Sequence, residues 1–154
     1  MALPLNAKVE ATPNFLANLE TAHQFFILQD ADTAASRLMK LKAELREMVQ
    51  VLAWSPAGSR LARFIDAKSA QARLKGEAVM LLAERAGLPS LREYVIGHHV
   101  VLYAHSDTEV VLLTLKFVSA YRKEYHSLFA SFFASFRVIG AVFQNANHRF
   151  DIIC

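Results

Sequence analysis

The stretch from Leu91 to Val118 constrains the fold of this chain more than any other segment. It contains three runs rich in valine, leucine, isoleucine and tyrosine, separated by short polar breaks at Gly97-His98 and at residues 105–108. Short runs of this composition joined by tight turns are typical of an antiparallel meander of three strands. Because the second and third runs are almost continuously apolar, we expect central strands that are covered on both faces.

The first half of the chain predicts the helices that would cover this sheet. Thr12 followed by Pro13 indicates a helix start, with threonine as the cap and proline in the first turn. Apolar residues then recur at helical spacing to about Leu28, and residues 29–32 form a break whose acidic residues can cap a second helix. The apolar stripe of that helix alternates steps of three and four residues, at Leu38, Leu41, Leu45, Met48 and Leu52. Two amphipathic helices joined by a tight break predict a helical hairpin with one shared apolar side.

Shorter signals complete the order of elements. Residues 7–11 are predicted to form a short strand, and residues 55–58 indicate a turn that leads into a loop. A third helix is predicted over residues 69–86, capped by Ser69 and ended by Gly87. Its buried side is expected to consist of four apolar residues, which are Leu74, Ala78, Leu81 and Leu82.

This order predicts an α+β domain in which the N-terminal helical hairpin packs on one face of an antiparallel β-sheet. We assign this domain to residues 1–118. Residues 119–154 are predicted to form an atypical, phenylalanine-rich C-terminal extension. Three roles stay open for it: it packs on the same domain, joins chains into homo-oligomers, or covers a groove that a partner segment would otherwise fill. On a helical wheel, the large apolar residues at the start of the extension fall on one side: Tyr121, Tyr125, Leu128, Phe129, Phe132, Phe133 and Phe136.

Composition narrows the class of protein. Of the 154 residues, 54% are hydrophobic and 20% are charged, which is a globular composition of a size suited to one domain. The net charge of +3 permits contact with nucleic acid or an acidic partner without requiring it. The single cysteine, Cys154, cannot form a disulfide within the chain, so a reducing, cytoplasmic location is expected. We see no signal-peptide pattern and no apolar run long enough to span a bilayer, so no membrane association is expected.

Four segments of the sequence, taken in order, resemble one protein family. They read Val-Glu-Ala-Thr-Pro-Asn-Phe-Leu-Ala-Asn-Leu at 9–19, Ser-Pro-Ala-Gly-Ser-Arg at 55–60, Leu-Arg-Glu-Tyr-Val-Ile-Gly at 91–97 and Val-Leu-Tyr-Ala at 101–104. Together with the element order over residues 7–116, they resemble the RelE/ParE superfamily of toxins from bacterial type II toxin–antitoxin modules. The resemblance implies a small toxin that is neutralised by a cognate antitoxin protein. RelE-like members cleave messenger RNA in the ribosome, whereas ParE-like members poison DNA gyrase.

Two departures from the family pattern bear on the target. Many nuclease members carry an arginine just before the Leu-Val-Tyr of the central strand, but here the preceding residues are His99, Val100 and Val101. Relatives also tend to end the last strand with a His-x-Arg-like ending, whereas this chain continues Leu-Lys-Phe-Val-Ser, and we hypothesise a shifted reading frame near Lys116. These departures favour ParE-like inhibition of DNA gyrase. The alternatives are a RelE-like ribosome-dependent endoribonuclease and an inactivated member that acts as a binding or self-associating domain.

Candidate site residues follow from the chemistry of RNA cleavage. This reaction needs a base for the 2′-hydroxyl, an acid for the leaving oxygen and cations for the charged transition state. Arg92 is the candidate catalytic cation, and His99 is the candidate acid or base because imidazole titrates near neutral pH. Arg60, Arg63 and Lys116 are the candidate target-binding cations.

Structural roles compete with these functional ones. Arg92 could form an ion pair, His98 and His99 are more typical of hairpin-turn residues than of catalytic ones, and His105 is expected to be exposed and inert. Adjacent histidines on a strand point to opposite faces and cannot easily share an ion, so neither a metal nor a cofactor is expected. An ordinary solvated face is expected for the basic residues of the second helix, which are Lys40, Lys42 and Arg46.

Overall fold

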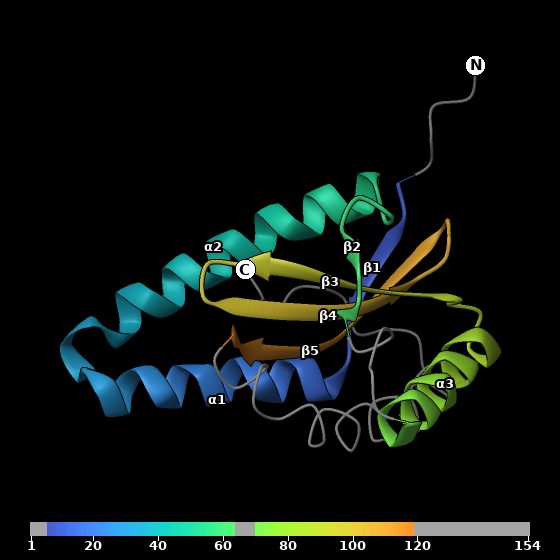
Figure 1. Cartoon of the computed structure of the whole chain (residues 1–154). Coiled ribbons are helices and arrows are strands. Elements are labelled where there is room, and N and C mark those ends of the chain that lie inside the picture. The colour runs from blue at the N-terminus through green and yellow to red at the C-terminus, as the bar shows by residue number, and fades with distance from the viewer. Residues whose placement is uncertain (1–5, 64–69, 119–154) are drawn as a thin grey trace.

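The computed structural model describes residues 6–63 and 70–118 (Figure 1). Its elements, in chain order, are β1 (Lys8–Ala11), α1 (Pro13–Gln29), α2 (Ala31–Trp54), β2 (Arg60–Leu61), α3 (Ala70–Arg85), β3 (Ser90–Ile96), β4 (His99–His105) and β5 (Glu109–Phe117). The prediction of an α+β fold is therefore confirmed. The C-terminal extension from residue 119 and the predicted helix cap at Ser69 lie outside the described residues.

The sheet has five strands in the order β1-β5-β4-β3-β2. As predicted, β3, β4 and β5 form an antiparallel meander, and its first turn is made by Gly97-His98. Gly97 has a φ of +52°, a conformation that favours glycine. The prediction of an antiparallel sheet is wrong at one edge, because β1 pairs in parallel with β5. The sheet is therefore mixed, and a strand of four residues carries no sequence signal for its partner.

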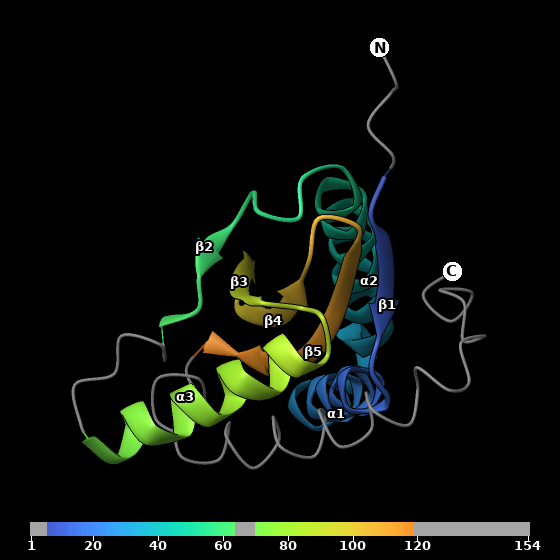
Figure 2. The same ribbon diagram turned by 90° about the vertical axis from the view of Figure 1, so that its right-hand side faces the viewer.

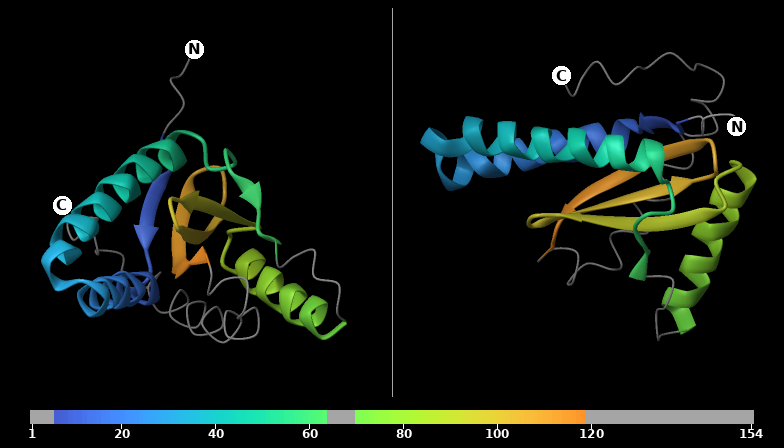
Figure 3. Two further views of the ribbon diagram at one scale, coloured as in Figure 1. Left: turned by 60° about the vertical axis from the view of Figure 1, so that its left-hand side comes forward. Right: turned by 90° about the horizontal axis from the view of Figure 1, so that it is seen from above.

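Helices cover both faces of the sheet (Figures 1, 2 and 3). The α1–α2 hairpin packs on one face through a core cluster that includes Phe15, Leu45 and Val101. On the other face, Val79 of α3 belongs to a second cluster, which includes Leu102. Consecutive residues of β4 thus face different helices, and this confirms the prediction of central strands covered on both faces. The expectation that the hairpin buries one face is incomplete, because α3 packs on the other.

Local signals set the ends of the hairpin helices as predicted. Thr12 caps α1 with Pro13 in the first turn, and the Asp30 side chain caps α2 by accepting a hydrogen bond from the Asp32 amide. The second helix therefore begins at Ala31, directly after the acidic cap expected within residues 29–32, and contains the whole Leu38–Leu52 stripe. With 24 residues, α2 is about 36 Å long, and the hairpin extends past the sheet (Figure 3).

The side that the third helix presents to the sheet was predicted only in part: Leu82 packs against the core as expected. Val79 and Ala83 are buried, whereas Leu74 and Leu81 are 67% and 47% exposed. Its end is as predicted: Gly87 has a φ of +76°, and the amides of Gly87 and Leu88 donate to carbonyls of the last turn. Leu88 is then buried against the sheet and fixes where α3 ends. None of the helices in residues 6–63 and 70–118 is both long and apolar enough to cross a membrane.

The buried cap of α1 gives a test of how the hairpin is attached to the sheet. The Thr12 hydroxyl accepts from the Phe15 amide at 3.2 Å and donates to the Leu113 carbonyl of β5 at 3.1 Å. We expect Thr12→Ala to lower the free energy of unfolding by about 1–2 kcal/mol, measured by urea denaturation. Thr21→Ala, at an exposed position of α1, should change it by less than about 0.5 kcal/mol. Equal effects of the two substitutions would contradict this role of Thr12.

Candidate functional site

Arg92 binds the loop that leads into β2. It does not form the ion pair that was the predicted structural alternative to a catalytic role. It lies half-buried on β3, where its Nε donates to Nε2 of His105 at 2.9 Å. Its Nη1 donates to the Ser59 carbonyl oxygen at 2.6 Å. Both acceptors are uncharged in this arrangement, so the guanidinium fixes the segment that leads into β2 against the sheet.

Tyr103 completes this attachment from β4. It pairs with Arg92 across the strands and is fully buried. Its hydroxyl donates to the Pro56 carbonyl oxygen at 2.8 Å and lies within hydrogen-bond distance of the Ser59 hydroxyl. Burial raises the pKa of Tyr103, so the phenol keeps its proton and remains a donor. We call Arg92, Tyr103 and His105 the loop anchor.

His105 is not the exposed, inert residue that was predicted. It is 5% exposed, and its Nε2 must be unprotonated to accept from Arg92. Its Nδ1 then carries the proton and donates to the Ser106 carbonyl oxygen at 3.0 Å. Burial lowers the pKa of His105, and the charge of Arg92 lowers it further. The structure therefore favours the neutral imidazole.

Arg60 and Arg63, the candidate target-binding cations, both pair with Glu93. Their Nε atoms lie 2.5 and 3.3 Å from Oε1 of Glu93, and the Arg63 amide donates to Oε2. The Glu93 side chain is 0% exposed, whereas the two arginine side chains are 44% and 50% exposed. Arg60 lies in β2, where a loop had been predicted. The arginines therefore neutralise a buried carboxylate and leave only their outer edges to a target.

His99 is buried at the opposite end of β4. Its ring lies edge-on to Phe117 at 5.2 Å and to Phe26 at 6.0 Å between centroids. Burial lowers the pKa of His99, and the positive potentials of His98 and Arg37 act in the same direction. His98 does occupy the predicted turn, but the same prediction is wrong for His99, which is the first residue of β4.

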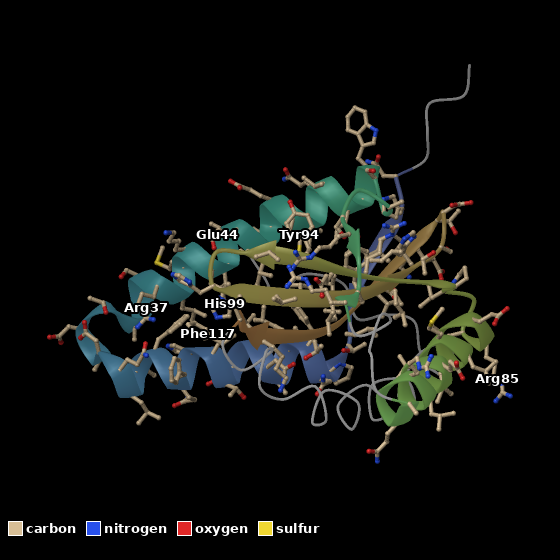
Figure 4. All side chains as sticks on the ribbon, in the orientation of Figure 1. Arg37, Glu44, Arg85, Tyr94, His99 and Phe117 are labelled. Atoms are coloured by element: carbon tan, nitrogen blue, oxygen red, sulfur yellow. The ribbon has the colours of Figure 1, made fainter. Side chains whose placement is uncertain are left out.

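A pocket of about 200 Å³ opens beside His99. Figure 4 shows Arg37 of α2, His99 and Phe117 of β5 close together, where the hairpin meets the ends of the strands. The Arg37 guanidinium carbon lies over the Phe26 ring, 4.2 Å from its centroid. Among the described residues, the lining consists of Phe26, Arg37, Lys40, Leu41, Glu44, Gly97, His98, His99 and Phe117.

This pocket was not predicted from the sequence. Lys40 was expected on a solvated face and Arg37 was not singled out, because the lining comes from both hairpin helices, the β3–β4 turn and the end of β5. One signal was available: Arg37, Lys40 and Glu44 recur at helical spacing and therefore share one side of α2, beside the buried Leu41.

The candidate catalytic residues do not form one site. Arg92 lies opposite Tyr103, whereas His99 lies opposite Ile96, so they are separated by about 13 Å along the strands. Lys116 pairs with Val100 near the end of β5 and is partly buried. In the part of the chain that the structure describes, no group of three or more His, Cys, Asp or Glu residues could hold a metal ion.

Replacing both arginines should destabilise the fold, because the Glu93 carboxylate is buried. We expect the double variant Arg60→Gln/Arg63→Gln to lose about 2–4 kcal/mol of unfolding free energy in urea denaturation, because Glu93 loses both cationic partners. Adding Glu93→Gln should restore part of this loss by removing the buried charge. Arg73→Gln, at an exposed position of α3, is the control and should have little effect. A double variant as stable as the wild type would refute a structural role for these pairs.

The two buried imidazoles predict a loss of stability in acid. Because the folded-state pKa values of His99 and His105 lie below the ordinary histidine value of about 6.5, the unfolded chain binds more protons as the pH falls through that range. Their contribution is complete above about pH 6.5 and is lost as the pH falls towards the folded-state pKa values. Melting temperatures measured from about pH 7.5 to about pH 5 should decline. His105→Gln should flatten this decline, whereas His23→Gln, outside both clusters, should preserve it.

Comparison with known proteins identifies no relative from which the role of the site could be inferred, so its interpretation rests on its own contacts. No protein-family model matches the sequence, and no curated protein sequence matches it. The candidate site therefore consists of two separate parts, which are the loop anchor with its neighbouring Glu93 pairs and the pocket beside His99.

Proposed function

We propose that this chain is the toxin of a bacterial type II toxin–antitoxin module and that it inhibits growth by binding DNA gyrase in the manner of ParE. The segments that resemble the RelE/ParE superfamily support this proposal. The α+β architecture, with a helical hairpin packed on a sheet, is compatible with that resemblance. The cognate antitoxin is the second partner that the proposal requires.

The observation that favours binding over RNA cleavage is the separation of Arg92 from His99. General acid–base catalysis requires groups that converge on one reacting phosphate within hydrogen-bond distance. Here Arg92 is engaged by His105 and the Ser59 carbonyl, while His99 is enclosed by aromatic rings about 13 Å away along the sheet. This geometry supports a protein that inhibits by contact.

The end of the helical hairpin offers a surface for that contact. Leu28 is 85% exposed, Met39 is 71% exposed and Phe25 is 41% exposed. These side chains lie within about two and a half helical turns of the α1–α2 connection. The hairpin that carries them extends past the sheet (Figure 3), and Phe25 also contacts Phe117 of β5. Exposed apolar side chains gathered on a projecting element are typical of a protein-binding surface. We assign the hairpin end to the target.

Gyrase supercoiling assays with matched variants test this proposal. The wild-type chain, expressed without a neighbouring antitoxin gene, should arrest growth of a bacterial host, and the purified chain should inhibit supercoiling and accumulate gyrase–DNA cleavage complexes. Leu28→Glu/Met39→Glu should weaken this inhibition by about tenfold or more, because two apolar contacts are lost. Leu74→Glu, which also replaces an exposed leucine but on α3, should inhibit as the wild type does.

Three other outcomes would contradict gyrase inhibition. Codon-specific cuts in ribosome-bound messenger RNA, detected by primer extension after cell-free translation, would indicate the RelE-like endoribonuclease. Absence of growth arrest would indicate an inactivated member that acts as a binding domain. Intact supercoiling activity at a large excess of the chain would exclude gyrase as the target in either case.

A further inference from the structure

The pocket beside His99 is lined by two cations that form no close ion pair with a described residue, although the charge of Arg37 acts on Asp30. Arg37 and Lys40 both line it. The ion pairs among residues 6–63 and 70–118 include Lys8 with Glu10, and Arg60 and Arg63 with Glu93. Neither Arg37 nor Lys40 belongs to one of these pairs, although both lie on the lining of a concave site.

Arg37 is positioned to bind an anion. Its guanidinium lies over the Phe26 ring, with 4.2 Å from the guanidinium carbon to the ring centroid. An arginine held by an aromatic ring can still present N–H donors in the plane of its guanidinium, and this fork matches the two oxygens of a carboxylate. Lys40, which is exposed and lies about one helical turn further along α2, adds a second positive charge to the lining.

The other residues that line the pocket suit the methylene groups of a short side chain. Phe26, Leu41 and Phe117 supply hydrocarbon and aromatic surface, and His99 adds an imidazole that burial keeps in its neutral form. A volume of about 200 Å³ is larger than the cavity of about 150 Å³ that can hold benzene, so one side chain fits. An aspartate or glutamate side chain combines the required features, since methylene groups lead to a carboxylate.

We infer that this pocket binds the carboxylate of an aspartate or glutamate in an acidic peptide segment of a partner protein. Glu44 also lines the pocket, so a singly charged carboxylate suits its balance of charges better than the dense charge of a nucleic-acid backbone. Phe25, 41% exposed and packed against Phe117, offers apolar surface for the residues that flank the acid. The inference stands on the pocket alone and does not depend on the proposed function.

Fluorescence anisotropy with the full chain tests this inference. The probe is a short fluorescein-labelled peptide that alternates leucine and glutamate, and its control has glutamine in place of every glutamate. The acidic peptide should bind with a dissociation constant below about 1 mM, whereas the glutamine peptide should bind at least about tenfold more weakly. Free glutarate and a single-stranded oligonucleotide serve as competitors, since they represent a small-molecule carboxylate and nucleic-acid phosphate.

Matched variants assign the binding to the pocket. Arg37→Gln should weaken binding of the acidic peptide by at least about tenfold, because a charge-assisted, forked contact is lost. Arg37→Lys should fall between Arg37→Gln and the wild type. Lys40→Gln should also bind the acidic peptide more weakly than the wild type. Because Lys40 is exposed, this variant should keep its fold, so it tests the inference even if Arg37→Gln is unstable. Arg85→Gln, on α3 and distant from the pocket in Figure 4, should bind as the wild type does.

Several results would overturn the inference. Equal affinities for the two peptides would show that the carboxylate is not recognised. Unchanged binding by Lys40→Gln and by folded Arg37→Gln would place the site elsewhere. Displacement of the peptide by the oligonucleotide at equal concentration would favour nucleic acid, and equally effective displacement by glutarate would favour a small metabolite over a partner protein. Absence of binding at millimolar concentration would exclude the acidic peptide altogether.

Discussion

Every residue of β4 is buried, and this constraint determines the chemistry at both ends of the sheet. The strand lies between β3 and β5, and its side chains alternate between the hairpin and α3. A histidine stands at each end, and a buried polar group is stable only where the surroundings satisfy or neutralise it. His105 meets this condition by accepting from Arg92, whereas His99 does so as a neutral ring among Phe26 and Phe117.

The need of buried polar groups for a partner also explains why the arginines near β3 stabilise the fold. Glu93 is buried completely, and an unpaired carboxylate at such a position would be strongly destabilising. Arg60 and Arg63 neutralise it from the edge of the sheet, while Arg92 is engaged by His105 and Ser59. A count of basic residues in the sequence therefore overstates the positive charge that a target can meet on this side of the molecule.

What the sequence predicted depended on short-range signals. Thr12-Pro13 and Gly97 act on their immediate neighbours, and the meander follows from hydrophobic runs within one segment. The errors concern contacts between segments far apart in the chain. A four-residue strand does not encode its parallel pairing with β5, and Glu93 in β3 gives no sign that Arg60 will lie beside it. Arg37 and Phe117 likewise become neighbours only after the hairpin docks on the sheet.

The pocket and the hydrophobic core are products of one packing event. Phe26 and Leu41 are members of the core cluster under the hairpin and also line the pocket, so their positions are fixed by the burial that stabilises the fold. A preformed site loses little conformational entropy when a ligand binds, which raises affinity for a given set of contacts. Because the unfolded chain has no such site, any ligand that occupies it must also stabilise the attachment of the hairpin to the sheet. Occupancy of the pocket and stability of the hairpin are therefore thermodynamically linked.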